Sequence, residues 1–210
     1  MSNYITHIGT DESGKGDFFG PLVIAGVMVD KYAAEKFIDA GIKDSKKITD
    51  KKILTLEPII KANSKYSVVA ISNLKYNELY LKIKNLNKLL AWGHARVIEN
   101  VLEQELCEYA LSDQFGDENL IKSALMDKGK SIRLEQMVRA ESDIAVAAAS
   151  VLARATFIHK MKEMENTYGL IFPKGCAQQV KDVASEFARQ YGKNRLQEVC
   201  KTHFKTYKEI

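Results

Sequence analysis

The sequence predicts an α/β protein in which helices cover a single mixed β-sheet. Three short β-prone runs lie in the first third of the chain, and helical and β-prone segments alternate after them. The run Ser142–Thr167 carries apolar residues at steps of three and four, which predicts a long helix with one apolar side. Strands followed by helix–strand alternation are typical of a mixed α/β sheet. At 210 residues, one domain spanning residues 1–210 is expected.

Strands are predicted where β-branched and aromatic residues gather between turn formers. The first two flank a glycine-rich loop and are expected to be antiparallel neighbours. The five predicted strands are Tyr4–Gly9, Leu22–Asp30, Tyr66–Ile71, Ala110–Ser112 and Ser131–Val138.

Helices are predicted from apolar periodicity and from capping residues. Thr49 is a suitable N-cap, and Gly41 and Gly169 are suitable stops. Gly93 disfavours a helix relative to Ala, so we expect close packing at that position; Trp92 beside it is assigned to the core. The predicted helices are Lys31–Ala40, the segment from Thr49 to Asn63, Leu74–Lys84, Asn85–Tyr109, Asp117–Asp127, Ser142–Thr167, Ala177–Tyr191 and Arg195–Thr206.

The composition is that of an ordinary globular protein, with 46% hydrophobic and 28% charged residues. A net charge of +4 and a pI near 8.8 are compatible with a polyanionic partner and equally with a lysine-rich solvated surface. Three widely spaced cysteines favour a reducing compartment. The N-terminus lacks a secretory pattern, and no apolar run approaches the ~20 residues of a membrane span. We therefore expect a cytoplasmic protein without a membrane partner.

The most informative stretch is Thr10–Pro21, which reads Thr-Asp-Glu-Ser-Gly-Lys-Gly-Asp-Phe-Phe-Gly-Pro. Two adjacent carboxylates, Asp11 and Glu12, run into Gly14-Lys15-Gly16. Carboxylates can hold a metal ion, and a backbone without side chains can approach a phosphate closely. Together they indicate phosphodiester chemistry, although the same residue types also form ordinary polar hairpins.

A second interpretation of the stretch is the phosphate-binding loop of nucleotide hydrolases, whose first seven positions Gly9–Lys15 match. The eighth position is Gly16, so the hydroxyl that would bind magnesium is missing. Asp11 and Glu12 would also place negative charge inside a loop that must hold phosphates. The run after Pro21 is rich in β-branched residues and predicts a strand, whereas that motif must open a helix. This interpretation is rejected.

The stretch resembles the signature of type 2 ribonucleases H, and specifically of ribonuclease HIII. Ribonuclease HII usually carries Gly-Arg-Gly where this chain has Gly14-Lys15-Gly16. The resemblance covers nearly the whole chain and implies the ribonuclease H-like fold, a central five-stranded mixed sheet flanked by helices, followed by C-terminal helices. Further segments resemble the family in the expected order: Lys43–Lys47, Ser112–Phe115, Ala140–Ser142 with Ala147–Ser150, Phe172–Gly175 and Thr202–Phe204.

By this resemblance, the catalytic and metal-binding residues are Asp11, Glu12, Asp113 and Glu141, with Asp143 as a competing fourth acid. Two-metal hydrolysis needs carboxylates from separate segments around ions about 3.5–4 Å apart, and Mg²⁺ or Mn²⁺ is the expected cofactor. Adjacent residues of a strand point to opposite faces. Asp11 and Glu12 are therefore expected to share a site only if the backbone turns near Glu12.

Substrate contacts are expected from the backbone of Gly14, Lys15 and Gly16, and phosphate contacts from the side chains of Lys15 and Lys46. Lys47 is as consistent with a solvated charge as with a phosphate contact. The backbone could approach both a phosphate and the 2′-hydroxyl that separates RNA from DNA. No set of residues suggests base reading, so we expect recognition of the backbone and of hybrid shape. The four histidines show no metal-binding spacing.

The resulting hypothesis is a metal-dependent endoribonuclease that cuts the RNA strand of RNA/DNA hybrids by two-metal-ion hydrolysis, leaving 5′-phosphate and 3′-hydroxyl ends. Two alternatives stay open: ribonuclease HII-like cleavage at single ribonucleotides in duplex DNA, and a non-catalytic hybrid-binding module. The enzyme is expected to be a monomer. Ribonuclease HIII normally carries an N-terminal substrate-binding domain. Because the signature begins within ten residues of Met1, we expect this chain to lack it.

Overall fold

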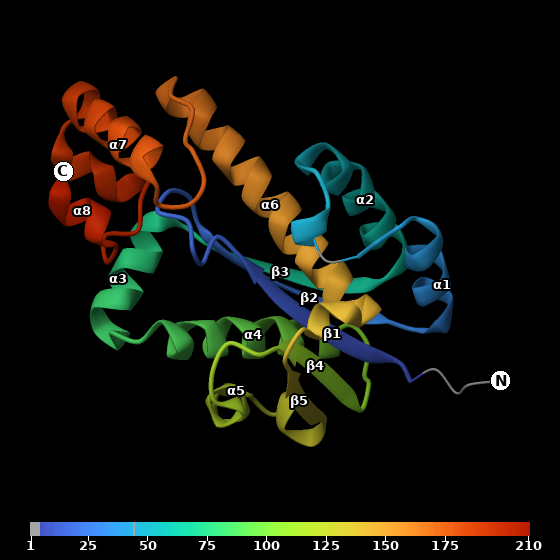
Figure 1. Cartoon of the computed structure of the whole chain (residues 1–210). Helices are drawn as coiled ribbons and strands as arrows, with labels where there is room; N and C mark the ends of the chain where they lie inside the picture. The colour runs from blue at the N-terminus through green and yellow to red at the C-terminus, as the bar shows by residue number, and fades with distance from the viewer. Residues whose placement is uncertain (1–4, 44) are drawn as a thin grey trace.

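The computed structural model describes residues 5–43 and 45–210. A five-stranded mixed sheet lies at the centre, with the strand order β3-β2-β1-β4-β5 and helices on both faces (Figure 1). β1 and β3 both run antiparallel to β2, whereas β4 runs parallel to β1 and to β5. The predicted α/β class and five-stranded mixed sheet are confirmed. The strands are β1 (His7–Ser13), β2 (Leu22–Val29), β3 (Lys65–Ile71), β4 (Tyr109–Asp113) and β5 (Arg133–Met137).

The helices begin and end close to the predicted capping residues. The Thr49 hydroxyl accepts the Lys52 amide as an N-cap, and Gly169 ends the longest helix in the left-handed region at φ 66°. The α-helices are α1 (Lys31–Asp39), α2 (Asp50–Asn63), α3 (Asn73–Ile83), α4 (Leu86–Leu102), α5 (Glu118–Ala124), α6 (Ile144–Tyr168), α7 (Gln178–Tyr191) and α8 (Lys205–Glu209). The short 3-10 helices are η1 (Ser45–Lys47), η2 (Gly129–Ser131), η3 (Ala140–Ser142) and η4 (Lys193–Glu198).

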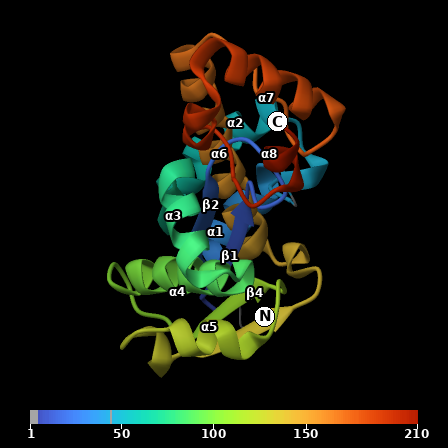
Figure 2. The same cartoon turned by 90° about the vertical axis from the view of Figure 1, so that its left-hand side faces the viewer.

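The period of two along the strands sorts side chains between two cores. On β2, Val23 and Ala25 pack with α6 and α2, and Leu22 and Ile24 pack with α4. All eight residues of β2 are buried, which its unbroken apolar sequence requires. α6, α1 and α2 cover one face, and α4 and α5 cover the other (Figure 1). α7 and α8 lie at the end of the molecule away from α5 (Figure 2).

Glycines allow close packing at two places beside β1 and β2. A Cβ on Gly9 of β1 would lie 2.1 Å from the carbonyl carbon of Ala145, so the start of α6 touches the strand directly. A Cβ on Gly93 of α4 would lie 2.7 Å from Cδ1 of Ile24. The close packing expected at Gly93 is therefore present, and the alanines at the start of α6 have the same effect.

Three predicted elements were wrong in extent. β1 does not stop at Gly9 but continues to Ser13; Tyr4 lies outside the described residues. α4 ends at Leu102 instead of Tyr109, since the polar residues that follow offer no apolar side and Tyr109 joins β4. The predicted helix from Arg195 to Thr206 is two short pieces separated by Val199–Phe204. Within that segment, residues 199–201 pair through their backbone with residues 18–20 of the signature loop, which runs from Gly14 to Gly20.

Two further expectations change. Trp92 was assigned to the core but is 40% exposed on α4. Among the helices of the described residues, α6 is long and apolar enough to cross a membrane by length and composition, so the expectation that no segment approaches that length was wrong. Because 67% of its most apolar window is buried inside the protein, α6 has the character of a core helix.

Candidate active site

The candidate site lies at the edge of β1, where β4 ends. The ladder between the two strands reaches Thr10 and Ser112, whereas β1 continues along β2 to Ser13. A cavity of about 380 Å³ opens at this point. It is lined by Asp11, Glu12, Ser13, Gly14, Lys15, Gly16, Asp17, Ser45, Lys46, Asp113, Gln114, Ser150 and Arg154.

The two adjacent acids reach this cavity from opposite faces of the sheet. Asp11 lies on the α6 side, where Ser150 hydrogen-bonds it, and Glu12 lies on the α4 side, where His94 contacts it. The predicted turn at Glu12 is absent, because β1 stays regular to Ser13 and the chain turns only at Gly14, with φ 85°. The two carboxylates share the cavity because the strand edge is open there.

Asp11 is held in a desolvated and negatively charged environment. Burial and, next, the charge of Glu12 raise its pKa to about 7, although Ser150 and the Glu12 amide, 2.8 Å from Oδ1, donate hydrogen bonds to it. The Ser45 and Ser150 hydroxyls are 2.7 Å apart, so Ser45 donates to Ser150 when Ser150 donates to Asp11. This hydroxyl pair links η1 to the carboxylate. Because burial and the charge of Glu12 destabilise the ionised form of Asp11, binding of a cation would stabilise it.

Glu12 is held by a buried histidine. His94 is fully buried, its Nε2 lies 3.2 Å from Oε2 of Glu12, and its Nδ1 lies 2.9 Å from the Thr10 hydroxyl. Lys15 lies 3.4 Å from the other carboxylate oxygen, and the Phe115 ring stacks on His94 at 4.7 Å. Burial raises the pKa of Glu12, but the hydrogen bond from His94 and then the charges of His94 and Lys15 leave it below its ordinary value. Glu12 is therefore held as an ionised carboxylate.

Asp113 lies at the carboxyl end of β4 and completes the group of acids in this cavity. Its Oδ1 accepts the Ala140 amide at 3.2 Å. Burial raises its pKa, and the negative charges of Glu141 and Glu12 raise it further. Glu141 lies on η3 and lines a different cavity. The structure therefore brings three of the four predicted acids into one cavity and puts the fourth within electrostatic reach of Asp113.

Asp143, the competing fourth acid, is engaged elsewhere. Its Oδ1 accepts the Ala145 and Val146 amides as the N-cap of α6, and His7 Nε2 lies 3.0 Å from both of its carboxylate oxygens. His7 and the helix N-terminus lower its pKa despite burial. These contacts favour Glu141 over Asp143.

The predicted substrate residues surround the same cavity. A Cβ on Gly14 would lie 2.2 Å from the Pro21 carbonyl oxygen, so the turn requires glycine there. A Cβ on Gly16 would meet no atom within 4 Å, so this position faces open space. Lys15 and Lys46 line the cavity, and the Lys46 charge lowers the pKa of Asp113. Asp44 and the Lys47 side chain lie outside what the structure describes.

The sequence prediction missed the supporting residues His94, Ser150 and Arg154. Arg154 on α6 donates to the Ser45 carbonyl and, at 2.6 Å, to Asp50, which also accepts Lys174 at 2.7 Å. These contacts clamp η1, and with it Lys46, beside the cavity. The only signal in the sequence was a polar residue on the apolar side of a predicted helix, which His94 and Ser150 both are.

The donors in this cavity suit a hard divalent cation. Carboxylate oxygens are the protein ligands that Mg²⁺ and Mn²⁺ prefer, and Mg²⁺ needs only one or two carboxylates beside water and substrate. No group of three or more histidine, cysteine, aspartate or glutamate side chains in the described residues is gathered tightly enough to hold a metal ion unaided. The residues therefore fit a metal that is held jointly by carboxylates, water and substrate.

Comparisons with known proteins give the family of this chain. The family model for ribonuclease HII matches residues 8–207. The chain belongs to the type 2 ribonuclease H family. Ribonuclease HIII of Protochlamydia amoebophila is 46% identical over 97% of this chain and 68% of its own length. Ribonuclease HIII of Chlamydia felis is 47% identical over 97% of this chain and 69% of its own length.

Solved structures confirm the ribonuclease H-like fold. Bst-RNase HIII in complex with Mn²⁺ superposes with a TM-score of 0.91 at 31% identity, over 98% of this chain and 68% of its own chain. Ribonuclease H2 from Pyrococcus horikoshii superposes with a TM-score of 0.83 at 23% identity, over 98% and 96%, and supports the fold alone. The resemblance to ribonuclease HIII seen in the sequence motifs is confirmed by these relatives.

Proposed function

We propose that this type 2 ribonuclease H cleaves the RNA strand of RNA/DNA hybrids with Mg²⁺ or Mn²⁺ as cofactor. One observation carries the proposal: three acids from β1 and β4 share a cavity with the Gly14–Asp17 turn. Cation ligands and a backbone that can approach a phosphate thus adjoin each other. Relatives named ribonuclease HIII, and a solved ribonuclease HIII containing Mn²⁺, support it.

The carboxylates of Asp11, Glu12 and Asp113, with Glu141 nearby, would hold the divalent ions. When bound, such ions lower the pKa of the attacking water and stabilise the departing 3′ oxygen, which leaves 5′-phosphate and 3′-hydroxyl ends. The protein supplies position and charge: His94 and Ser150 orient Glu12 and Asp11, and the turn around Gly16 receives the RNA backbone.

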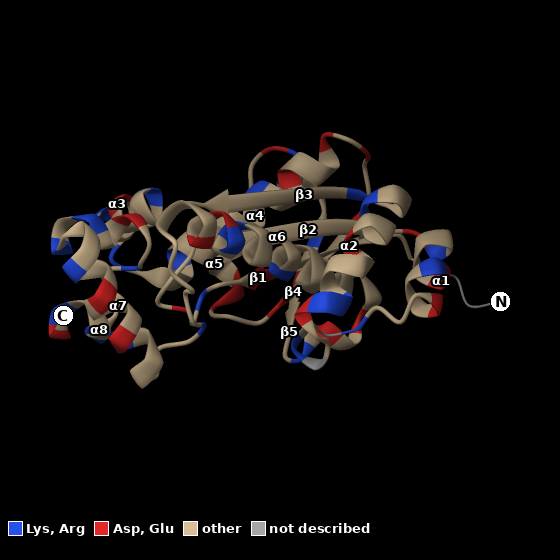
Figure 3. Cartoon of the chain, turned by 90° about the horizontal axis from the view of Figure 1, so that it is seen from above, with Lys and Arg blue, Asp and Glu red and all other residues tan. Residues whose placement is uncertain are grey.

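Lys15 and Lys46 are the phosphate-contact candidates at the rim. Lysines and arginines are otherwise distributed among acids along the helices (Figure 3), so binding would rest on these local contacts and on hybrid shape. No base-reading set lines the cavity. Cleavage should therefore show little preference for sequence.

The decisive experiment is Asp11→Asn, which removes one metal-ligand charge and keeps the side-chain volume. We expect loss of more than about 10³-fold in cleavage, comparable to the loss of a major electrostatic group in other enzymes, with an intact fold. Asp117→Asn, at the exposed N-cap of α5, is the matched control and should cleave normally. Full activity of Asp11→Asn would refute the assignment.

The same assay separates the two enzyme interpretations. Long hybrids and DNA duplexes with one embedded ribonucleotide are offered in parallel with Mg²⁺ and with Mn²⁺. Preferred cutting of the long hybrid supports the proposal, and preferred cutting at the single ribonucleotide supports ribonuclease HII-like activity. Binding without cutting in either metal would support the non-catalytic module.

We further propose a monomeric cytoplasmic enzyme that needs no membrane. The large exposed apolar side chains, such as Ile5, Leu106 and Ile171, come from widely separated elements, as on most monomers. Cys107, Cys176 and Cys200 are free thiols, which suits a reducing compartment. Light scattering of the purified chain and fractionation of cells that express it would test both statements.

A further inference from the structure

A fully buried lysine lies beneath the signature loop, outside the cavity that holds the acids. Lys201 follows η4 and is 0% exposed. Its Nζ donates to the Asp17 carbonyl at 2.9 Å and to the Gly20 carbonyl at 2.6 Å, and lies 5.6 Å from the centre of the Tyr76 ring. A protonated lysine amine has three N–H groups, and here two carbonyls and one aromatic face receive them. The buried amine is thus fully satisfied, and both carbonyls belong to the loop.

The neighbours of Lys201 also bind the loop, and residues 199–201 together form a C-terminal strap. The Gly20 amide donates to the Val199 carbonyl at 3.0 Å, the Lys201 amide donates to the Phe18 carbonyl at 2.9 Å, and Phe19 forms a bridge with Cys200. On the other side, the Gly175 amide donates to Oδ1 of Asp17 at 2.6 Å. The segment 17–20 is thereby held between residues far away in the sequence.

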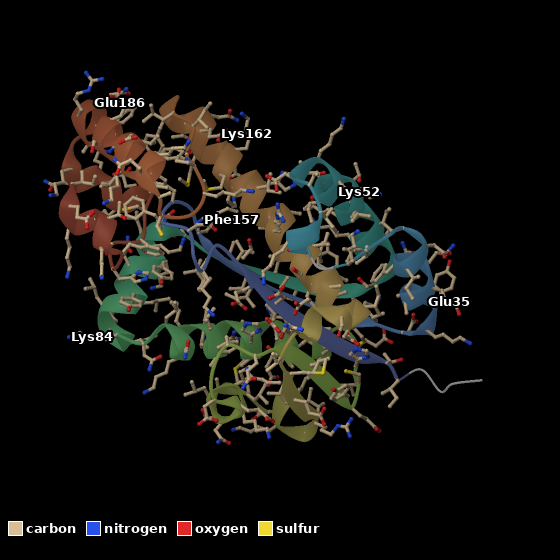
Figure 4. The ribbon with its side chains drawn as sticks, in the orientation of Figure 1. Glu35, Lys52, Lys84, Phe157, Lys162 and Glu186 are labelled. Carbon is tan, nitrogen blue, oxygen red and sulfur yellow. The ribbon has the colours of Figure 1, made fainter. Side chains whose placement is uncertain are left out.

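The Phe157 ring of α6 packs against the loop at Gly14 and Gly20. A Cβ on Gly14 would lie 2.8 Å from its ring and a Cβ on Gly20 would lie 3.0 Å from it. Figure 4 shows the labelled Phe157 on α6 beside the loop. The loop is therefore packed against Phe157 and held by hydrogen bonds at Asp17, while Gly16 faces open space.

Three glycines, at positions 14, 16 and 20, make the free loop unusually permissive. If the turn became ordered only on binding, the lost conformational entropy would weaken the binding of substrate. A turn that is already fixed avoids this cost. Burying an amine is unfavourable in itself, so stability alone would be served as well or better by an apolar side chain. The gain from Lys201 is the fixed position of two particular carbonyls.

We propose that Lys201 is a positioning residue for substrate binding, which holds the Gly14–Asp17 turn in the geometry that receives the RNA backbone. This role rests on the proposed function, since it assumes that the turn contacts the hybrid. It makes the C-terminal strap, residues 199–201, part of the substrate-binding apparatus although Lys201 itself does not line the cavity. Lys201 acts on the substrate only through the loop.

The test uses Lys201→Met, which removes both donors and keeps most of the volume. Affinity is measured by fluorescence anisotropy with a labelled RNA/DNA hybrid, in the Asp11→Asn background so that the hybrid is not cut. We expect a loss of about 10- to 100-fold in affinity, the size of two lost hydrogen bonds to a binding loop. In the otherwise wild-type enzyme, KM should rise by a similar factor and kcat should change by less than about threefold.

A matched control separates positioning from general instability. Phe187→Leu removes packing from α7, where the Phe187 ring packs with Tyr168, Phe172 and Tyr191 and has no ring contact with Phe18 or Phe19 of the loop among the described residues. It should lower the melting temperature without changing hybrid affinity by more than about twofold. Asn73→Ala removes a second donor to the Gly20 carbonyl, 2.8 Å away, and gives a milder test if Lys201→Met does not fold; it should weaken the binding of the hybrid by ~3-fold or more.

The outcomes are distinct. If the parent binds hybrid and a folded Lys201→Met variant binds it within twofold of the parent, the role of Lys201 is refuted and the proposed function stands. The role is also refuted if Phe187→Leu, with the same loss of stability as Lys201→Met, weakens hybrid binding by the same factor. If Lys201→Met does not fold, an unchanged hybrid affinity of Asn73→Ala refutes the role. If the parent binds no hybrid at all, the proposed function fails and the role falls with it.

Discussion

The most direct test of the site architecture is His94→Phe, because His94 orients Glu12 without reaching the cavity itself. An ionised carboxylate can only accept, so Nε2 of His94 donates to Glu12 at 3.2 Å, while Nδ1 shares a hydrogen bond with the Thr10 hydroxyl at 2.9 Å. Phenylalanine keeps the ring that stacks on Phe115 and removes both hydrogen bonds. Glu12 then loses its anchor while its neighbours remain in place.

The expected size follows from the burial of this hydrogen bond. A hydrogen bond to a charged group contributes about 1.5–3 kcal/mol, which corresponds to roughly 10- to 100-fold in a binding constant. Loss of a hydrogen-bond partner behind a ligating carboxylate typically lowers metal affinity by the same ~10- to 100-fold. We therefore expect His94→Phe to bind Mn²⁺ about 10- to 100-fold more weakly, and to lose about 1–3 kcal/mol of stability in chelator.

The assay is calorimetric titration of the metal-free protein with Mn²⁺, paired with urea unfolding in chelator. His94→Gln keeps a side-chain N–H that can donate to Glu12 and should recover part of the affinity. Ile98→Val, on the same helix and in a separate part of the core, loses ~1 kcal/mol without touching Glu12 and should bind Mn²⁺ normally. A folded His94→Phe protein that binds Mn²⁺ within twofold of the parent would refute the reasoning.

Two further predictions concern the signature loop and its tether. A Cβ at position 16 meets no atom within 4 Å, so Gly16→Ala should change the free energy of unfolding by less than ~0.5 kcal/mol and raise the KM for hybrid. At Gly14, φ is 85° and the Pro21 oxygen is in the way, so Gly14→Ala should lose at least ~1–3 kcal/mol of stability. Equal effects of the two variants on stability would contradict this assignment. Burial lowers the pKa of Lys201 to about 7 from 10.5 in the unfolded chain, against the charge of Asp17. Between those two pKa values the unfolded state binds more protons, so the free energy of unfolding should rise with pH. Measured by urea unfolding, the parent should gain about 2–3 kcal/mol relative to Lys201→Met from pH 7 to 9. Parallel plots of stability against pH for the two proteins would contradict this.

The sequence alone was sufficient for the layers of the fold because its signals are local. The β-branched run of β2 and the apolar stripe of α6 each determine an element whatever the rest of the chain does, and the capping residue Thr49 marks the start of α2. The C-terminal strap could not be predicted in this way. Its residues had helical character, and two of their amides still donate to Leu196, but the Val199 carbonyl and the Lys201 amide bond to Gly20 and Phe18, about 180 positions away in the chain.

For the site, the acids could be named and their supports could not. Asp11, Glu12 and Asp113 stand at strand ends within recognisable motifs, and the structure puts all three in one cavity. His94 lies in no recognised motif, and Ser150 ends the Ala147–Ser150 motif without a role assigned to it; the roles of both depend on which helix covers which face of β1. A residue that acts by contacting another across the sheet is visible only once the register is known.

The register also explains how two adjacent acids serve one site without a turn between them. In a strand flanked on both sides, the neighbouring backbone would separate the two faces, and side chains i and i+1 could not meet. Here β4 stops at Asp113 while β1 runs on to Ser13, so the faces join around an open edge. Asp11 is then oriented from the α6 layer and Glu12 from the α4 layer, each through its own hydrogen bonds. The shortness of β4 is therefore as much a requirement of this site as the acids themselves, because one more paired residue on each strand would divide the cavity.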